Sequence, residues 1–154
     1  MSYRIAGLDP APFAALHALN DCELEARGMR RVRIGRAHIA PCRISLDDAA
    51  IGEDVLLINY EHQPAATPYR QQGPIFIRSA AAPFEAENTM PPALRRRLLS
   101  LRGFDAEGMM IEAGVAEGAA AEALIEQFFA NADVAYIHAH YAGRGCFAAR
   151  IDRA

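Results

Sequence analysis

Lysine and tryptophan are absent from this chain of 154 residues, and all 16 of its basic residues are arginine. Without lysine the protein cannot form a Schiff base or use an ammonium group as a general base. Any positive side chain that recognises a ligand is therefore a guanidinium, which pairs with carboxylates and phosphates through two parallel hydrogen bonds. If the protein binds an anionic ligand through a strongly basic side chain, that side chain is an arginine.

Cysteine is scarce, and long apolar stretches are missing. The three cysteines, Cys22, Cys42 and Cys146, are odd in number and far apart in the chain, which argues against a disulfide framework. The first residues lack the apolar segment of a secretory signal, and no window approaches the ~18 consecutive apolar residues of a membrane helix. We therefore expect a soluble, cytoplasmic protein with reduced thiols and no membrane partner.

The net charge of −3 provides no global positive field to attract nucleic acid. The one basic run, residues 95–97, lacks interleaved aromatic residues and is typical of a solvated helix face. Glycine-rich phosphate loops of the GxGxxG or GxxxxGK[ST] kind are also absent. We expect no nucleic-acid partner and no cofactor.

The composition, 52% hydrophobic and 23% charged, is that of a globular protein, and the length fits a single domain spanning residues 1–154. Strand and helix patterns alternate without a strict βαβ order, which predicts an α+β fold with a mostly antiparallel sheet and two to three helices packed against it. Strands are expected at 3–8, 29–34, 42–45, 55–60, 73–78, 134–141 and 146–151. A hairpin-like turn is expected at 105–108, flanked by Phe104 and by residues 109–115. Helices are expected at 10–19, at 21–27, from Pro91 through the apolar face formed by Leu94, Leu98 and Leu101, and after Gly118. Residues 79–90 are expected to be a linker.

Five segments carry a resemblance to a known family: PCRISLDDA (41–49), VLLINYEHQ (55–63), TPYRQQGPIFIR (67–78), RRRLLSLRGFD (95–105) and YIHAHYAGRGCFAARI (136–151). Together they resemble the bacterial family catalogued as domain of unknown function 1203. The resemblance implies a small bacterial protein of one domain. It implies no activity, cofactor or catalytic residue, so the candidate sites below are argued from the residues alone.

A polar segment between two apolar runs is the most informative stretch of the chain. Residues 55–58 lead into it and residues 75–77 lead out of it, so we interpret the part between as a long, ordered loop. Glu61 beside His62 is a candidate acid–base pair, because a neighbouring carboxylate can raise the pKa of an imidazole and hold it as a general base. The alternative is that these groups satisfy the backbone of the loop itself. The candidate ligand-binding residues of the same segment are Asn59, Tyr69 and Arg70.

Three arginines lie within or at the ends of apolar strand patterns: Arg43, Arg78 and Arg150. A guanidinium in such a position must find a partner or face a cleft. Arg43 and Arg78, together with Arg70, are candidate clamps for an anionic ligand. The alternative is that they pair with acidic residues of the chain, for which Asp47, Asp48, Glu61 and Glu112 are available.

His138 and His140 are two residues apart on a predicted strand and share a face. We include them among the ligand-binding candidates. Two imidazoles are an incomplete metal site, and no CxxC or HExxH spacing supports one, so the prediction is that they bind no metal. In the alternative, His62, Glu61 or Cys146 supplies a third ligand.

The register of the C-terminal hairpin decides whether Cys146 lies beside these histidines. If Tyr141 lies opposite Cys146, the histidine face also carries Phe147 and Ala149. If the turn is a three-residue loop with Gly145 in the left-handed region, the histidine face carries Cys146, Ala148 and Arg150. The sequence is compatible with both. A catalytic role for the Cys146 thiol has no motif to support it, because a free cysteine usually behaves as a small apolar group.

We predict that the protein binds a small anionic ligand, a carboxylate or phosphate, in a cleft formed by the 59–78 loop and the C-terminal hairpin. Whether it catalyses a reaction is left open. One alternative is a homodimer or partner-binding module without catalysis, whose interface uses Tyr136, His138, Tyr141 and Phe147. The other is a metal protein built on His138 and His140.

Overall fold

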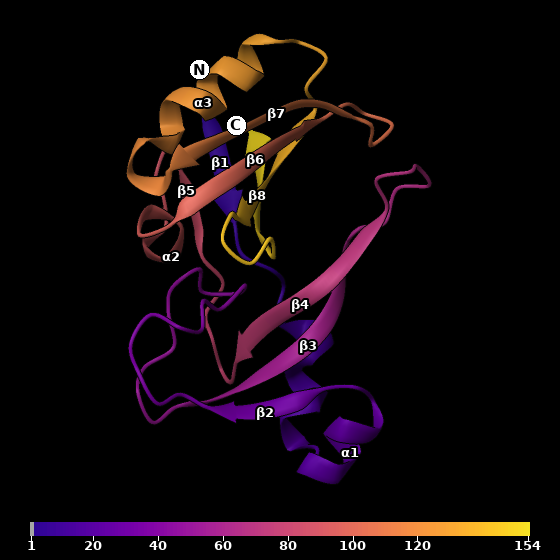
Figure 1. Ribbon diagram of the computed structural model, residues 1–154, viewed down its shortest axis with the longest axis vertical. Coiled ribbons are helices and arrows are strands. Elements are labelled where there is room, and N and C mark those ends of the chain that lie inside the picture. Colours follow the sequence, from indigo (N-terminus) through magenta and orange to yellow (C-terminus); the bar gives the residue numbers. More distant parts are fainter. Residues whose placement is uncertain (1) are drawn as a thin grey trace.

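The computed structural model describes residues 2–154 and shows two antiparallel sheets, one above the other (Figure 1). The larger sheet has six strands in the order β5-β1-β9-β8-β6-β7. Its strands are β1 (Tyr3–Ala6), β5 (Glu85–Glu87), β6 (Leu98–Phe104), β7 (Met110–Glu117), β8 (Tyr136–Tyr141) and β9 (Phe147–Arg153). The smaller sheet has the order β2-β3-β4, with β2 (Arg30–Arg33), β3 (Asp54–Gln63) and β4 (Gln71–Arg78). The predicted α+β class with mostly antiparallel pairing is confirmed.

Helices are few and short. The longest α-helix, α3 (Ala121–Ala130), packs Ile125, Phe128 and Phe129 into the core of the six-stranded sheet. The others are η1 (Ala11–Ala18), α1 (Asp21–Ala26), α2 (Pro92–Arg95) and η2 (Gly118–Ala120). The helix α1 begins with a capping box, in which the Asn20 side chain accepts from the Glu23 N–H and the Glu23 carboxylate accepts from the Asn20 N–H. Its residue Leu24 is buried under the three-stranded sheet together with Phe13 of η1.

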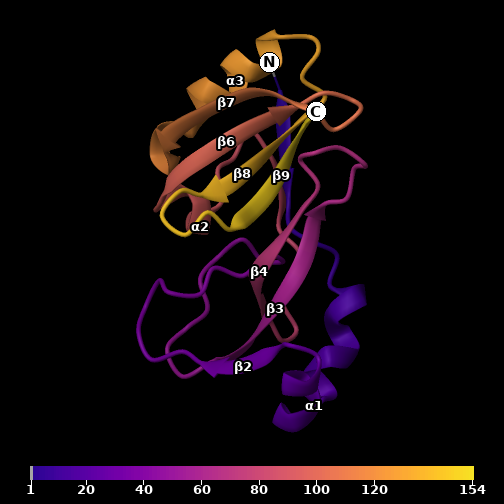
Figure 2. The same ribbon diagram turned by 45° about the vertical axis from the view of Figure 1, so that its right-hand side comes forward.

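The polar segment that the sequence predicts as a long loop is mostly strand. Strand β3 continues to Gln63 and β4 begins at Gln71, so only residues 64–70 connect them. The prediction failed because one face of the outer part of this hairpin is polar, while His62 and Gln63 are buried against the six-stranded sheet. Figure 2 shows the hairpin rising from the three-stranded sheet to lie beside the larger one.

The helix predicted from Pro91 through Leu101 is also wrong after its first turn. It ends at Arg95, and Leu98–Phe104 forms β6, between β8 and β7. Leu99 and Leu101 are buried and Leu98 is exposed, the alternation of a strand. The apolar spacing suits either period, and pairing with two neighbouring strands decided between them. Two smaller predictions also fail. Of the expected strand 42–45, Cys42 forms an isolated bridge with Phe76 and residues 43–45 form a turn. The expected 79–90 linker contains β5.

The chain passes from the six-stranded sheet to the smaller sheet at Gly7. Its N–H donates to the Phe84 carbonyl, and the next N–H, of Leu8, donates to the carbonyl of Arg43 at 2.8 Å. A Cβ at Gly7 would lie 1.8 Å from the carbonyl oxygen of Ile44. The absence of a side chain at Gly7 therefore lets β1 approach the Arg43–Ile44 backbone, and this contact positions the Arg43 side chain between the sheets.

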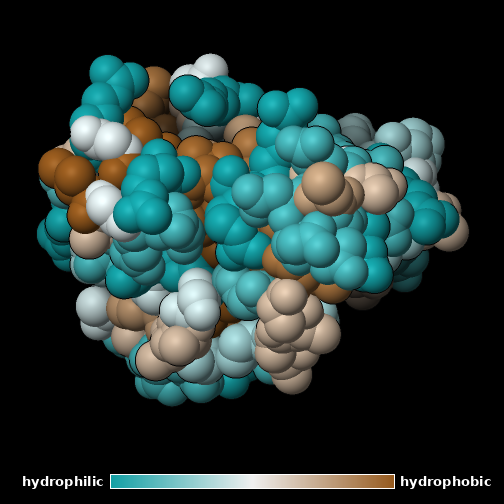
Figure 3. All heavy atoms as spheres, turned by 90° about the horizontal axis from the view of Figure 1, so that it is seen from below, coloured by the Kyte–Doolittle hydropathy of each residue, from teal (hydrophilic) through white to brown (hydrophobic). Residues whose placement is uncertain are grey.

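The lower end of the molecule, which carries the three-stranded sheet, is mostly hydrophilic, and hydrophobic residues are visible mainly in recesses (Figure 3). No helix among residues 2–154 has the length and apolar character needed to span a membrane.

Candidate functional site

A cavity of about 660 Å³ opens between the two sheets. One side is formed by β3 and β4 through Leu57, Pro74 and Phe76, and the other by the β8–β9 turn. The segment 38–43 closes a third side, and Arg97 and Leu98 complete the lining. The cavity thus lies between the β3–β4 hairpin and the C-terminal hairpin, and of the ligand-binding residues predicted from the sequence it is lined by Arg43.

The cavity carries three guanidiniums and no carboxylate among its lining residues, which include Arg43, Arg97 and Arg144. Its other walls are apolar, from Ile39, Leu57, Phe76 and Leu98 among others. A cavity with this lining favours a molecule that has both a negative group and an apolar part.

Arg43 is the most deeply buried of the three arginines, at 2% exposed. Its Nε donates to the Phe147 carbonyl at 2.7 Å, and its Nη1 donates to the Pro41 carbonyl. Within residues 2–154 no carboxylate forms an ion pair with it. Burial lowers the pKa of this guanidinium, although an arginine stays protonated in proteins. A buried positive charge that is hydrogen-bonded to carbonyls and paired with no carboxylate lacks the counter-ion that normally accompanies it.

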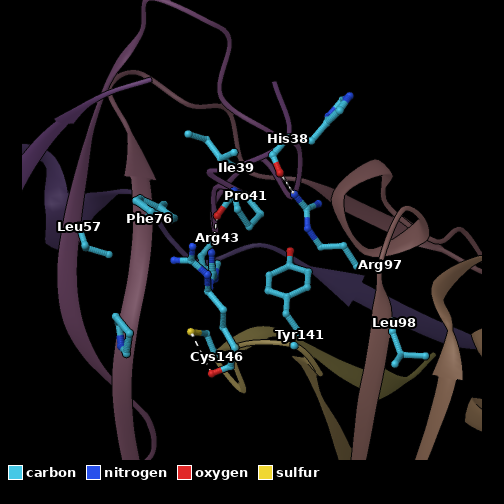
Figure 4. Close-up of a pocket in the computed structure, with 13 residues that line it drawn as sticks. His38, Ile39, Pro41, Arg43, Leu57, Phe76, Arg97, Leu98, Tyr141 and Cys146 are labelled. Carbon is cyan, nitrogen blue, oxygen red and sulfur yellow. Dashed lines mark hydrogen bonds between the residues drawn. The ribbon is translucent and has the colours of Figure 1, made fainter. Parts of the chain in front are cut away.

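Tyr141 stands between Arg43 and Arg97 in the cavity (Figure 4). The guanidinium carbons lie 5.0 and 5.2 Å from its ring centroid, so both cations face the electron-rich ring. Its hydroxyl is buried, and no hydrogen-bond partner for it exists among residues 2–154. Desolvation raises the pKa of Tyr141 to about 12, so the phenol is neutral near pH 7 and offers an unused O–H donor.

Arg97 is paired, unlike Arg43. Its Nη2 donates to Asp48 at 2.6 Å. The same Nη2 donates to the His38 carbonyl at 2.8 Å (Figure 4). The Asp48 carboxylate, only 5% exposed, also accepts from Arg96 at 3.2 Å. The sequence interpretation of residues 95–97 as a solvated face therefore fails at Arg97, whose role depends on an acid 49 positions away in the chain.

The other predicted clamps lie away from this cavity. Arg70 forms a bidentate, exposed pair with Glu61 at 2.9 and 3.2 Å, and Arg78 donates to Glu53 at 2.6 Å. Asn59 is exposed on β3, and Tyr69 is exposed near a second, smaller cavity. For Arg70 and Arg78 the geometry is the internal pairing that the sequence left open, although the partner of Arg78 is an acid not considered there.

The proposed acid–base pair is not assembled. Neighbouring residues on a strand point to opposite faces, so the Glu61 carboxylate turns out to Arg70 while His62 is buried. Nδ1 of His62 has no hydrogen-bond partner among residues 2–154. The carboxylate therefore does not orient the imidazole.

Instead, His62 lies against His138 and His140 of β8. One nitrogen of each imidazole lies within 4.8 Å of the other two. Strands of different sheets thus bring together three residues that are distant in sequence. Cys146 lies elsewhere: it lines the large cavity, and all three cysteines are free.

Both hairpin registers that the sequence allowed occur in the C-terminal hairpin. Next to the turn, the Tyr141 N–H donates to the Cys146 carbonyl at 2.9 Å, Gly145 has φ of 76°, and His140 lies opposite Phe147. A β-bulge then shifts the pairing, so His138 lies opposite Arg150. The turn fixes the first register and the bulge changes it to the second.

The residues named for a partner interface are internal. Tyr136, His138, Tyr141 and Phe147 are each at most 8% exposed. Strand β3 lies against Tyr136, His138 and Phe147. Tyr141 instead packs in the core of the six-stranded sheet, beside Arg43 and Arg97. They offer no exposed face to another molecule, and dimerisation stays a prediction without a surface assigned to it.

The residues of the cavity that sequence reasoning missed include Leu57, Phe76, Arg97, Tyr141 as a hydrogen-bond donor, and Arg144. The sequence pattern around each of them is that of a strand core, a turn or a solvated surface. Only Arg144, between two glycines before a cysteine, carried a local signal of a special turn.

Residues 39–153 match the family described as protein of unknown function DUF1203, so the chain belongs to this family. The resemblance noted from the sequence is confirmed. No curated protein and no solved structure matches the chain.

Proposed function

We propose that this protein binds a small organic anion in the cavity between its sheets, and that it does so in the cytoplasm. The observation that carries the proposal is Arg43: a buried guanidinium at the cavity, bonded to two carbonyls and paired with no carboxylate of residues 2–154. A bound carboxylate or phosphate supplies the missing counter-charge. The three free cysteines support a reducing compartment.

Three further donors favour the same class of ligand. The Tyr141 hydroxyl is an unpaired donor beside Arg43, Arg97 adds a second positive charge, and Arg144 lies exposed at the turn. Buried donors around an anion give short, charge-assisted hydrogen bonds. The exposed Arg144 acts earlier, by attracting the anion towards the cavity at low ionic strength.

The apolar walls narrow the class of ligand. Leu57, Phe76 and Leu98 leave room for a body that carries few polar groups, and about 660 Å³ suits a small metabolite rather than a single inorganic ion. We therefore expect aryl or branched-chain carboxylates, or phosphate esters with an apolar group, to bind more tightly than inorganic phosphate.

The test is a thermal-shift panel of carboxylate and phosphorylated metabolites, followed by calorimetric titration of each compound that stabilises the protein. Selective binding to the native state must raise the unfolding temperature. At least one compound is expected to do so. No shift with any member at several millimolar would overturn the proposal.

The variant Tyr141→Phe isolates the site because it removes only the unpaired hydroxyl. Its own stability should be unchanged or slightly higher, since a buried unsatisfied polar atom is lost. Its affinity for a ligand from the panel should fall about 10-fold or more, the effect of one hydrogen bond to a charged group. The matched control is Tyr60→Phe on β3, outside the cavity, which should bind the ligand as the wild type does.

A further inference from the structure

We propose that His62, His138 and His140 form a binding site for a divalent transition-metal ion. The site is separate from the anion cavity: none of the three histidines lines that cavity. It joins the two sheets, because His62 comes from β3 and the other two from β8. Imidazole is a ligand that zinc, copper, nickel and iron all accept.

The hydrogen bond of His140 is the first observation. Its Nδ1 lies 2.9 Å from the carbonyl oxygen of Gly145. A carbonyl can only accept, so Nδ1 carries the proton, and in the neutral ring Nε2 keeps its lone pair. That Nε2 is buried and has no partner among residues 2–154. A backbone carbonyl that orients a histidine in this way is typical of metal-binding histidines.

The unused nitrogens are the second observation. Nδ1 of His62 and Nδ1 of His138 are also buried without a hydrogen-bond partner within residues 2–154. Buried polar atoms are normally paired, and three such nitrogens in one cluster call for a common explanation. A cation bound among them satisfies any that point towards it.

The spacing is the third observation. The candidate ligand atoms lie within 4.8 Å of one another. Zinc bonded to nitrogen at about 2.0–2.1 Å in a tetrahedron holds its ligand atoms roughly 3.3 Å apart. The rings must therefore close by up to about 1.5 Å when the ion binds, a movement that side-chain rotation supplies.

The aromatic surroundings hold the rings near this arrangement. Phe147 stacks on His62 with centroids 4.9 Å apart and an interplanar angle of 4°. Its ring also lies 5.1 Å from that of His138. The apolar surroundings keep the imidazoles neutral: desolvation lowers the pKa of His62 to about 4, of His138 to about 3 and of His140 to about 4. Neutral imidazole is the form that binds a metal.

The chemistry of a fourth ligand follows from Arg102. A cavity of about 190 Å³ is lined by His62 and Arg102, and Arg102 forms no ion pair with a carboxylate of residues 2–154. Three histidines leave a tetrahedral ion one open position. The positive charge of Arg102 favours hydroxide or another anion there, which also offsets the repulsion between Arg102 and the ion.

The experiment is a titration of chelator-treated, untagged protein with Co²⁺ and with Zn²⁺, followed by visible absorption and by calorimetry. One ion per chain is expected, with the strong visible absorption of tetrahedral Co²⁺ and a dissociation constant in the micromolar range or below. X-ray absorption of the zinc-loaded wild type should count three imidazoles. No stoichiometric binding, or fewer than three imidazoles, would overturn the proposal, and neither result depends on a variant.

Two substitutions sharpen the test. His62→Phe keeps an aromatic ring against Phe147 and removes one ligand, so the affinity for zinc should fall at least about 100-fold. His17→Gln, on η1 and outside the cluster, should bind zinc as the wild type does. Equal zinc affinity in His62→Phe and the wild type would contradict the site. Anion binding should survive in His62→Phe, so the two proposals can fail separately.

Discussion

Phe147 contacts two groups of buried polar residues: an arginine group, Arg43 and Arg97 with Tyr141, and the cluster of three histidines. The two groups differ in whether their side chains stay charged when buried. The backbone carbonyl of Phe147 accepts from Arg43 in the anion cavity, and its ring stacks on His62 in the histidine cluster. The arginine group keeps its charge and uses carbonyls, an aromatic ring and Asp48 to hold it. The three imidazoles are neutral near pH 7, because burial lowers the pKa of each of them.

The difference teaches what each group can bind. A guanidinium cannot lose its proton, so it retains the need for an anion. An imidazole becomes neutral and presents a lone pair, so it suits a cation. Two sites that are similarly buried next to Phe147 therefore favour ligands of opposite charge, an anion at the arginines and a cation at the histidines.

The largest expected effect on stability comes from Gly7→Ala, because Gly7 packs against the backbone of Arg43 and Ile44. The new Cβ would lie 1.8 Å from the Ile44 carbonyl oxygen, so the backbone next to Arg43 must move. We expect a loss of about 3 kcal/mol or more in the free energy of unfolding, measured by urea denaturation. Gly35→Ala, where a Cβ meets no atom within 4 Å, is the control and should change stability by less than ~0.5 kcal/mol. Equal stability of the two variants would contradict the close approach.

Next is Asp48→Asn, which removes the acid that holds Arg97. The Asp48 side chain is 5% exposed and Arg97 19%, so the lost charge leaves a largely buried cation without its partner. We expect a loss of about 2–4 kcal/mol in the free energy of unfolding. Asp47→Asn removes the more exposed pair with Arg96 and should cost at most ~1 kcal/mol. Similar losses in the two variants would mean that burial does not separate these pairs.

The histidine group predicts a dependence on pH. The folded-state pKa values of about 4, 3 and 4 lie below the ordinary 6.5, so between these limits the unfolded chain binds more protons. Stability is then complete above pH 6.5 and is lost as the pH falls towards 4. From pH 7.5 to 5 we expect a loss on the order of 2 kcal/mol or more in urea denaturation with a chelator present.

The matched variant for this pH dependence is His62→Phe, which removes one of the titrating groups. Its loss of stability between pH 7.5 and 5 should be smaller than that of the wild type. A wild type equally stable at both pH values would mean that the imidazoles are not buried as neutral groups.

The smallest effect is expected from Arg70→Gln. The guanidinium is exposed and pairs with Glu61 at the surface, outside the anion cavity. Neither stability nor the affinity for a ligand from the anion panel should change measurably. A clear loss of ligand affinity would return Arg70 to the set of anion clamps that the sequence suggested.

Much of the architecture was readable from local patterns. The β3 core, the helix α3, the turn at Asp105–Gly108 and the C-terminal hairpin all follow from periodicity and turn residues, because these signals lie within a few neighbouring positions. The strand β6 was missed since its leucines fit a helical period as well. Its identity depends on pairing with β8 and β7, which no local pattern records.

The sequence by itself determined which side chains are available for chemistry. Guanidinium is the only strong cation, the cysteines lack disulfide spacing, and two histidines share one face of a strand. Only the tertiary structure decided the groupings. Among residues 2–154 it pairs Arg43 with no acid, pairs Arg70 with Glu61 and Arg78 with Glu53, and brings His62 to the other two histidines. The physical reason is that pairing, burial and desolvation depend on distances between strands of different sheets, and residue order does not fix those distances.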